Sequence, residues 1–147
     1  MTKVLFLCHG NICRSPMAEY IFKNMANGED IYIESKAVSR EEIGNDIYPP
    51  AKRKLQEKGI PFSRHYARQI TMEDYANFDY IIVMESYNLP RLMNIIGEDR
   101  ENKVSRLLDF TDTPGDISDP WYSGDFETAF REITRGCQAL LKTIKKI

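Results

Sequence analysis

The chain has 147 residues, a length that suits one folded domain with a sizeable hydrophobic core. Its formal net charge of −2 gives no support for a nucleic-acid partner, and the sequence contains no apolar stretch typical of a membrane span or signal peptide. Three cysteines, an odd number, do not read as a secreted disulfide framework. We therefore expect a single cytoplasmic domain, residues 1–147, without a nucleic-acid or membrane partner.

Apolar runs and helical periodicity alternate along the chain. Continuous apolar runs predict strands, and apolar residues that recur at three- and four-residue spacing predict helices. Strands that alternate with helices and are apolar on both sides favour a doubly wound α/β domain, with a four-stranded parallel sheet and helices on both faces. In chain order, the expected elements are strand 3–7, helix 16–26, strand 31–34, helix 49–55, a helix from 71, strand 80–84, helix 86–96, strand 104–108 and helix 125–146.

The segment CHGNICRS, residues 8–15, follows directly on the first predicted strand. A loop closed by Cys8 and Arg14 can turn successive backbone N–H groups inward, which makes a concave nest for a tetrahedral oxyanion. The guanidinium adds a planar, two-pronged clamp. Gly10 and Asn11 both tolerate a positive φ, which a tight loop needs. The sequence therefore predicts a phosphate cradle with a thiol at its floor.

The helix after this loop strengthens the interpretation. Ser15 is predicted to cap the helix and Pro16 to occupy its first position, where a missing N–H costs nothing. The positive end of the helix, together with the Ser15 hydroxyl, is then expected to stabilise the thiolate of Cys8. An activated sulfur that faces a phosphate pocket indicates covalent catalysis.

Residues 8–16, followed by Met-Ala-Glu, resemble the signature of the low molecular weight protein tyrosine phosphatases. The sequence Asp-Pro-Trp-Tyr at 119–122 resembles the second motif of that family, and residues 65–69 and 78–81 resemble further family segments. The resemblance implies hydrolysis of phosphotyrosine through a phosphocysteine intermediate. It also implies that the substrates are tyrosine-phosphorylated proteins and that no metal or organic cofactor takes part.

The resemblance assigns a role to each motif. Cys8 is the expected nucleophile, Arg14 binds the phosphate, and Asp119 acts first as general acid and then as general base. From its sequence alone, Asp119 would start an ordinary Asp-Pro turn, and Asp112 and Asp116 lie nearby, but neither of those precedes proline. The remaining residues expected to bind substrate are His9, Gly10, Asn11, Ile12, Cys13, Ser15, Trp121 and Tyr122.

Supporting roles follow from the resemblance alone. It implies that Ser35 and Asn11 hold the loop in shape and that His65 buttresses the loop asparagine. Taken by its composition, a lone histidine between Arg64 and Tyr66 is more simply a surface residue. His9 is expected at the pocket rim or in solvent, and we do not predict a catalytic role for it.

The cysteines other than Cys8 have different expected roles. The resemblance implies a reversible Cys8–Cys13 disulfide that protects the nucleophile from irreversible oxidation. Without the resemblance, Cys13 would be interpreted as a buried residue that only fills space. Cys137 lies on the apolar stripe of the last predicted helix and is expected in the core.

Selectivity for an aryl group is less clearly encoded. Trp121 and Tyr122 are expected to form an aromatic wall against a phosphotyrosine ring. Glu41 stands where some family members carry a second aromatic wall, and Lys36 stands where a small residue is common. These two differences from the family pattern predict a weaker grip on the aryl group without a change in the chemistry.

Alternative functions use the same loop. Protein arginine phosphatases resemble this family but tend to carry threonine where this chain has Ile12. Arsenate reductases on this fold need a relay of further cysteines, and residues 81–97 contain none. A phosphotyrosine-binding module or a phosphocysteine carrier remains a further alternative, against which Arg14 and Asp119 argue because a carrier needs slow hydrolysis and a binder needs no acid.

Overall fold

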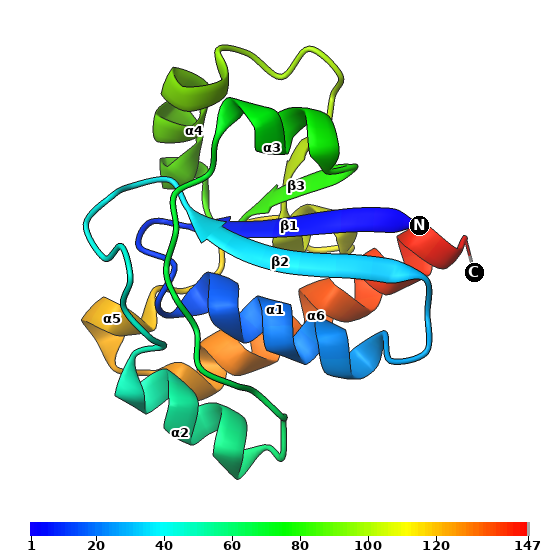
Figure 1. Cartoon of the computed structure of the whole chain (residues 1–147). Coiled ribbons are helices and arrows are strands. Elements are labelled where there is room, and N and C mark those ends of the chain that lie inside the picture. Colours follow the sequence, from blue (N-terminus) through cyan, green and yellow to red (C-terminus); the bar gives the residue numbers. More distant parts are fainter. Residues whose placement is uncertain (147) are drawn as a thin grey trace.

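The predicted strands form one parallel sheet in the computed structural model, which describes residues 1–146. Within that range there are four strands, β1 (Thr2–Cys8), β2 (Ile31–Ala37), β3 (Tyr80–Val83) and β4 (Val104–Arg106). Their spatial order is β2-β1-β3-β4, and each neighbouring pair is parallel (Figure 1). The prediction of a doubly wound, four-stranded parallel sheet is confirmed.

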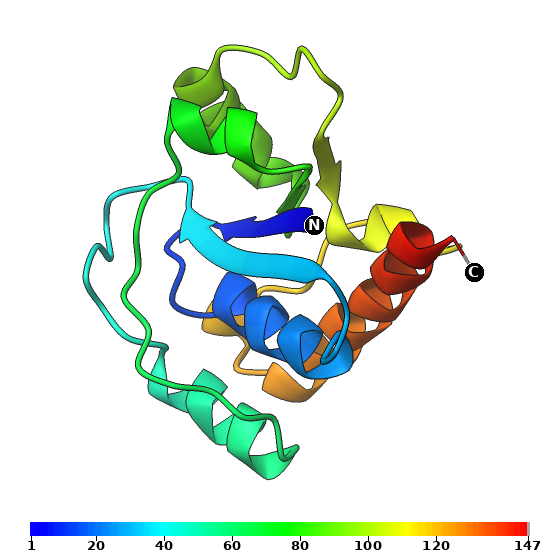
Figure 2. The same cartoon turned by 45° about the vertical axis from the view of Figure 1, so that its right-hand side comes forward.

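Helices cover both faces of this sheet, as predicted (Figure 2). One face carries α1 (Arg14–Met25), α2 (Pro49–Glu57) and α6 (Phe126–Lys145), and the other carries α3 (Met72–Asn77) and α4 (Leu89–Ile96). Within residues 1–146, no helix is both long and apolar enough to cross a lipid bilayer.

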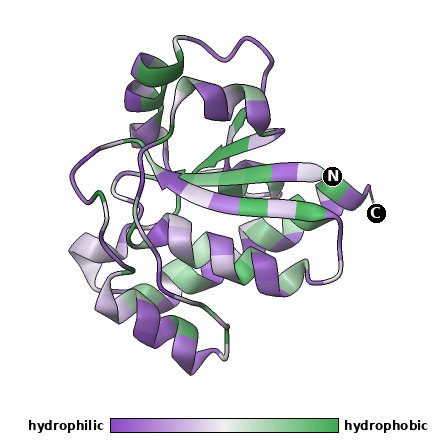
Figure 3. Ribbon diagram, in the orientation of Figure 1, coloured by the Kyte–Doolittle hydropathy of each residue, from purple (hydrophilic) through white to green (hydrophobic). Residues whose placement is uncertain are grey.

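The central strand β1 is apolar on both sides because it lies between two hydrophobic cores. Val4, Phe6 and Cys8 belong to the core beneath α1, α2 and α6. Leu5 and Leu7 belong to the core beneath α3 and α4. A strand buried on both faces has a continuous apolar sequence instead of an alternating one, which is visible along β1 in Figure 3.

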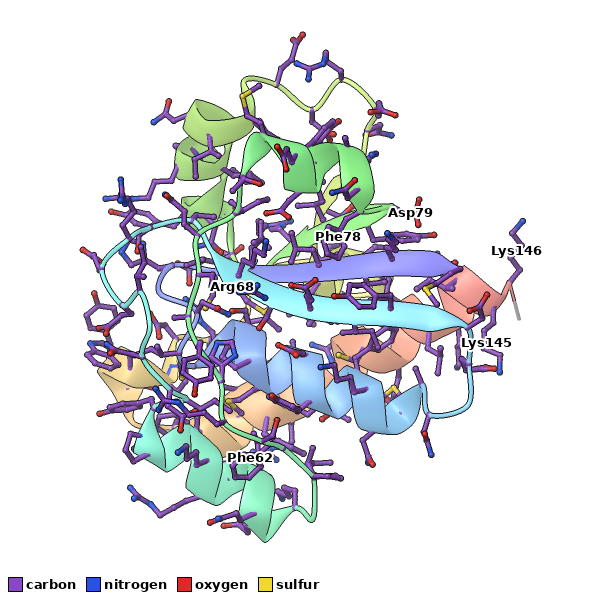
Figure 4. The ribbon with its side chains drawn as sticks, in the orientation of Figure 1. Phe62, Arg68, Phe78, Asp79, Lys145 and Lys146 are labelled. Carbon is purple, nitrogen blue, oxygen red and sulfur yellow. The ribbon has the colours of Figure 1, made fainter. Side chains whose placement is uncertain are left out.

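The topology places a ligand site at the end of β1. From β1 the chain passes to β2 on one side and then crosses to β3 on the other side, which makes the carboxyl end of β1 a topological switch point. The segment before α3 also runs along this end of β2, and its Arg68 pairs with Glu34 at 2.7 Å (Figure 4). Loops from distant parts of the sequence therefore converge where Cys8 ends its strand.

The start of α1 differs from the prediction. Arg14 is already helical and Cys13 is the N-cap residue, so Ser15 does not cap the helix and Pro16 is not its first residue. The Ser15 hydroxyl contacts the Cys8 sulfur and the Asn11 side chain instead. The contact with Cys8 agrees with the predicted support of the sulfur by this hydroxyl, which is therefore not used to cap the helix.

Several other boundaries shift. The strand predicted at 31–34 continues to Ala37, and the one predicted at 80–84 ends at Val83. The strand predicted at 104–108 ends at Arg106 and continues as a 3₁₀ turn, Leu107–Phe110. The helix predicted at 86–96 is divided into a 3₁₀ turn, Ser86–Asn88, and α4, because Pro90 suits only the first turn of a helix. The short helix α5, Pro120–Ser123, was not predicted.

Close packing at Gly136 provides a test of this fold. A Cβ atom at this position of α6 would lie 2.5 Å from Cγ of Leu107, which is fully buried. Alanine normally stabilises a helix interior by about 1 kcal/mol relative to glycine. We nevertheless expect Gly136→Ala to lower the free energy of unfolding by about 1–3 kcal/mol, because overpacking outweighs helix propensity.

Urea denaturation checks this prediction. Gln138→Ala, at an exposed position of the same helix, is the matched control and should change the midpoint little. A stabilised Gly136→Ala variant would contradict the packing of α6 against the Leu107 turn.

Candidate active site

A cavity of about 410 Å³ opens at the carboxyl ends of β1 and β3. Among the predicted residues, Asp119, Trp121 and Tyr122 line it together with the loop residues Cys8, His9, Gly10, Ile12, Cys13 and Arg14. Asn11 and Ser15, also expected to bind substrate, are fully buried and are not among the lining residues of this cavity. The structure therefore brings the two sequence motifs together, with the loop as floor and the second motif as wall.

The carbonyl groups of the loop point away from the cavity. Val38 N–H donates to the carbonyl of Cys8 at 3.0 Å, and Ser39 N–H donates to that of His9 at 3.1 Å. On the opposite side of the loop, Tyr48 N–H donates to the carbonyl of Ile12 at 2.7 Å. In a planar trans peptide the N–H points opposite to the C=O. The amides that follow these carbonyls therefore face the interior of the loop, as an anion-binding nest requires.

The thiol of Cys8 lies at the floor of this nest. Its sulfur is 3.0 Å from Ser15 Oγ and 3.4 Å from the Ser15 backbone nitrogen, which donates to it. Asn11 Nδ2 donates to Ser15 Oγ at 2.8 Å. Because Ser15 Oγ accepts that bond, its own proton can be directed at the Cys8 sulfur. Two donors are thus arranged around a sulfur that carries negative charge when deprotonated.

Asn11 is the residue on which the loop is built. Its φ of 60° lies in the left-handed region, which asparagine adopts more readily than most side chains. Its Nδ2 donates to Ser15 and, at 3.0 Å, to Ser35 Oγ. Its Oδ1 accepts from His65 Nε2 at 3.0 Å and from Arg68 N–H at 3.3 Å. Gly10 does not use the positive φ expected of it, and instead packs closely against Glu42.

His65 is buried, so the surface interpretation based on composition is wrong. Its Nε2 lies within hydrogen-bond distance of two acceptors, the carbonyl of Asn11 at 2.8 Å and the Asn11 side-chain oxygen. Two acceptors require that Nε2 carries a proton, which fixes the tautomer of the neutral ring. Burial lowers the pKa of His65, which favours this neutral form.

A further member of this network is Glu19, to which the sequence analysis assigned no role. Its Oε1 accepts a hydrogen bond from Ser35 Oγ at 2.5 Å, and its Oε2 accepts one from Lys23 at 2.6 Å. Glu19 is buried on α1, four residues after Ser15 and hence on the same helix face. That spacing is the sequence signal which could have identified it.

Arg14 is buried and held from three directions. Its Nη1 donates to the carbonyl of Ile117 at 2.8 Å and pairs with Glu85, and its Nη2 lies 3.5 Å from Asp119 Oδ2. Glu85 lines the cavity but was missed by the sequence analysis. It lies two residues after β3 and directly after the strand predicted at 80–84, and the carboxyl ends of parallel strands meet at one edge of the sheet. That position after the strand is the signal for it.

Asp119 differs clearly from the competing aspartates. It precedes α5, and its Oδ1 accepts a hydrogen bond from Trp121 N–H at 3.1 Å while its Oδ2 faces Arg14. Asp116 instead pairs with Arg106 at 3.1 Å and accepts from Ser86 N–H at 2.9 Å. Among residues 1–146, Asp112 and Asp116 are not part of the cavity lining. The geometry therefore favours Asp119 as the carboxylate of the site.

The mouth of the cavity is partly aromatic. Trp121 and Tyr122 are exposed at the mouth. The centre of the Tyr48 ring lies 4.6 Å from the centre of the Trp121 ring. His9 lines the rim and contacts Glu41, which also lines the cavity. Lys36, which stands where a small residue is common in the family, pairs with Asp74 at 2.9 Å and is not among the cavity-lining residues of the described part of the chain.

All three cysteines fall within residues 1–146, and each is a free, buried thiol there. Burial raises the pKa of Cys13, and the nearby Cys8 and Asp119 raise it further. Cys137 is fully buried, as predicted, and burial raises its pKa as well. The described residues hold no group of three or more His, Cys, Asp or Glu side chains placed to bind a metal ion.

The lowered pKa of His65 predicts a dependence of stability on pH. An unfolded chain binds a proton at His65 near pH 6.5, whereas the folded chain binds it only at lower pH. The contribution of His65 to the free energy of unfolding is therefore fully present above pH 6.5 and is lost as the pH falls below that value. We expect His65→Gln, which keeps an N–H donor, to reduce the loss of unfolding free energy between pH 7 and pH 5.

Urea denaturation at both pH values checks this expectation. Gln69→Ala, in the same segment, is the control and should retain the wild-type dependence on pH. An unchanged pH dependence in His65→Gln would show that the imidazole is not kept neutral by the fold.

Comparison with known proteins identifies the family. A family model described as low molecular weight phosphotyrosine protein phosphatase matches residues 3–147. The chain is 38% identical to the low molecular weight protein-tyrosine-phosphatase YfkJ of Bacillus subtilis, over 99% of this chain and 97% of that protein. The two structures superpose with a TM-score of 0.93, over 99% of this chain and 96% of YfkJ.

Two further relatives extend the comparison. The human low molecular weight phosphotyrosine protein phosphatase is 41% identical, over 95% of this chain and 93% of its own length. The structure of Wzb from Vibrio vulnificus, in complex with benzylphosphonate, is 27% identical and superposes with a TM-score of 0.86, over 97% of this chain and 98% of that one. The chain therefore belongs to the low molecular weight phosphotyrosine protein phosphatase family.

Proposed function

We propose that Cys8, Arg14 and Asp119 carry out the phosphotyrosine hydrolysis of this family in two steps through a phosphocysteine on Cys8. One observation carries the assignment. The Cys8 sulfur lies beneath a loop whose carbonyls point outward, while the buried Arg14 faces both the loop and Asp119, at 3.5 Å. Nucleophile, oxyanion donors and acid are thus gathered in one cavity.

In the first step, the Cys8 thiolate attacks phosphorus and the bond between phosphorus and the tyrosine oxygen breaks. The inward N–H groups of the loop and the Arg14 guanidinium hold the equatorial phosphate oxygens as charge develops on them. Protonated Asp119 gives its proton to the departing phenolate oxygen. The Ser15 hydroxyl, 3.0 Å from the sulfur, stabilises the thiolate before attack.

In the second step, water attacks the phosphocysteine from the side that the tyrosine has left. The Asp119 carboxylate takes a proton from this water, the sulfur–phosphorus bond breaks, and the Cys8 thiolate and inorganic phosphate are released. One carboxyl group therefore serves as acid and then as base, and the enzyme returns to its starting state.

Glu85 and the Ile117 carbonyl act as positioning groups in this scheme. Both engage Nη1 of Arg14, while its Nη2 faces Asp119 and the side chain lines the cavity. A planar guanidinium that is held along one edge presents its other donors in a fixed direction. These contacts orient the Arg14 guanidinium before phosphate binds.

The cavity also suits an aryl phosphate. The exposed rings of Trp121 and Tyr122 and the side chain of Ile12 line the same cavity as the thiol. An apolar side chain at that point favours a phenyl ring over a polar phosphoguanidinium. The Vibrio relative was solved with benzylphosphonate, in which a methylene group joins a phenyl ring to a phosphonate, so that ligand combines an aromatic ring with a tetrahedral oxyanion. We infer that tyrosine-phosphorylated proteins are the substrates.

A comparison of three phosphopeptides tests this function. Peptides of one sequence that carry phosphotyrosine, phosphoserine or phosphoarginine should be hydrolysed with phosphotyrosine strongly preferred, measured as kcat/KM by phosphate release. Preference for phosphoarginine would support the arginine phosphatase instead. Tight binding of phosphotyrosine without turnover would support a binding module.

Replacement of the nucleophile should abolish turnover. We expect Cys8→Ser to lose all measurable activity while it still binds phosphate, because the alcohol has no accessible anionic form near neutral pH. Acid quenching of the wild-type enzyme with labelled substrate should trap phosphate on Cys8, which mass spectrometry locates. Cys137→Ser, in the core, is the control and should retain the trapped phosphate; phosphate found on any residue other than Cys8 would reject the assignment.

Replacement of the acid should depend on the leaving group. We expect Asp119→Ala to slow phosphoenzyme formation by about 10²–10⁴-fold with a tyrosine phosphate, whose phenolate needs a proton. The loss should be much smaller with p-nitrophenyl phosphate, whose leaving group departs without protonation. Rapid-quench measurement of the first step separates this effect from slow water attack in the second step.

The matched control for the acid is Asp116→Ala. Asp116 is a surface aspartate that pairs with Arg106, so its replacement should show no dependence on the leaving group. Equal losses with both substrates in Asp119→Ala, or a larger effect in Asp116→Ala, would move the general acid away from Asp119.

The redox role of Cys13 is a separate proposal. Peroxide oxidises the Cys8 thiolate to a sulfenic acid, and attack by the Cys13 sulfur releases water and forms a disulfide. We expect a thiol reductant to restore the peroxide-treated wild type but not peroxide-treated Cys13→Ser. Mass spectrometry of the oxidised wild type should show Cys8 joined to Cys13. A bond to Cys137, or recovery of Cys13→Ser equal to that of the wild type, would reject this pairing.

A further inference from the structure

The mouth of the active-site cavity is built from several separate segments, one of which is the turn Ser86–Asn88 with the exposed ring of Tyr87. The segment after β2 contributes Glu41 and Glu42, α4 contributes Arg91, and α5 contributes the aromatic wall. In Figure 1 the chain after β2, α4 and α5 surround the loop that follows β1, with α4 above the loop and α5 below it. Acidic, basic and aromatic side chains therefore lie on different segments around the entrance.

The wall formed by Glu41 and Glu42 is acidic. The Glu41 side chain is 64% exposed at the rim, where it contacts His9. Glu42 lies against the phosphate loop, since its Cγ is 3.1 Å from the position that a Cβ of Gly10 would occupy. Its carboxylate accepts a hydrogen bond from the neutral amide of Asn45 at 2.6 Å, a contact that leaves its charge uncompensated. Two carboxylates thus face a cavity that takes a phosphate dianion.

The other charged groups of the cavity have different positions. Glu85 and Asp119 lie deeper, and both face the buried Arg14. Arg91 is exposed on α4 and lines the cavity. The mouth therefore carries a positive group on the α4 side and negative groups on the side of the segment after β2.

A bound phosphopeptide would place its neighbouring residues on these walls. With phosphate at the loop, the backbone of the phosphotyrosine lies at the mouth, and residues of an extended peptide follow one another at about 3.3 Å. The residues that flank the phosphotyrosine then lie beside Glu41 and Glu42 on one side and beside Arg91 on the other. Opposite charges at these contacts attract and like charges repel.

We propose that this mouth selects phosphotyrosine peptides with opposite charges on the two sides, a basic side chain against Glu41 and Glu42 and an acidic side chain against Arg91. This inference rests on the proposed function and names its substrate class. It also explains the absence of an aromatic residue at Glu41, because that wall recognises charge and leaves ring stacking to Trp121 and Tyr122.

Four peptides test the proposal. They share one phosphotyrosine sequence and differ in the flanking residues: lysine before and glutamate after, the reverse order, lysine on both sides, and glutamate on both sides. We expect one of the two mixed peptides to have the highest kcat/KM. Each matched charge should raise kcat/KM by about two- to fivefold, which is the size of effect that an exposed ion pair gives. The order that is preferred fixes the direction in which the peptide lies. The advantage should shrink at 0.5 M salt, because exposed charges are screened.

Charge-neutral variants assign the effect to each wall. Glu41→Gln combined with Glu42→Gln should remove the advantage of the lysine and keep that of the glutamate, whereas Arg91→Gln should do the reverse. Glu73→Gln on α3 and Arg53→Gln on α2 are the matched controls, since both residues are exposed and neither is among the cavity-lining residues within 1–146. The controls should keep the wild-type ranking.

The outcomes separate this proposal from the proposed function. Equal kcat/KM for all four peptides, a uniformly charged peptide as the best substrate, or an unchanged ranking in the mouth variants would overturn the charge selection. p-Nitrophenyl phosphate, which has no flanking residues, reports the chemistry by itself. Wild-type enzyme that hydrolyses neither this compound nor any of the peptides would overturn the proposed function instead.

Discussion

The geometry of the site depends on the left-handed backbone of Asn11 and on the four hydrogen bonds of its side chain. A residue at φ 60° reverses the direction of the chain within the loop, and that conformation costs energy in any residue with a Cβ. Bonds to Ser15, Ser35, His65 and the Arg68 backbone compensate this cost. They also tie the loop to α1, β2 and the segment before α3, so the nest is held from outside.

The same network links the thiol to groups far from it in sequence. Asn11 occupies an acceptor position of the Ser15 hydroxyl, which directs the proton of that hydroxyl to Cys8. His65 can support Asn11 in this way only while its Nε2 carries a proton, and burial favours the neutral form of the ring. A histidine without any contact to substrate is thereby coupled to the reactivity of the nucleophile.

The loop and the parallel sheet could be predicted because their signals are local. Spacing between Cys8 and Arg14, and apolar runs of the right length, are properties of short segments. Glu85 has only a weaker signal, its position after an apolar strand, because its pairing with Arg14 depends on the adjacency of β1 and β3. The expected effect of Lys36 on the aryl group also depended on information that the local sequence lacks, the face of the sheet on which its side chain lies. Successive residues of a strand face opposite sides of the sheet, so Ser35 reaches Glu19 on α1 while Lys36 reaches Asp74 on α3.

The proposed acid, Asp119, and the proposed nucleophile, Cys8, are positioned by shared contacts, although more than a hundred residues separate them. Arg14 donates to the carbonyl of Ile117, two residues before Asp119, so the clamp of the phosphate also fixes the segment of the acid. Tyr48 forms a second connection, because its N–H donates to the Ile12 carbonyl and its ring lies against Trp121. A shift of the phosphate loop would therefore move both ends of the Asp119 turn. Under the proposed mechanism, these contacts keep Asp119 close to the tyrosine oxygen of a phosphate that is bound in the loop.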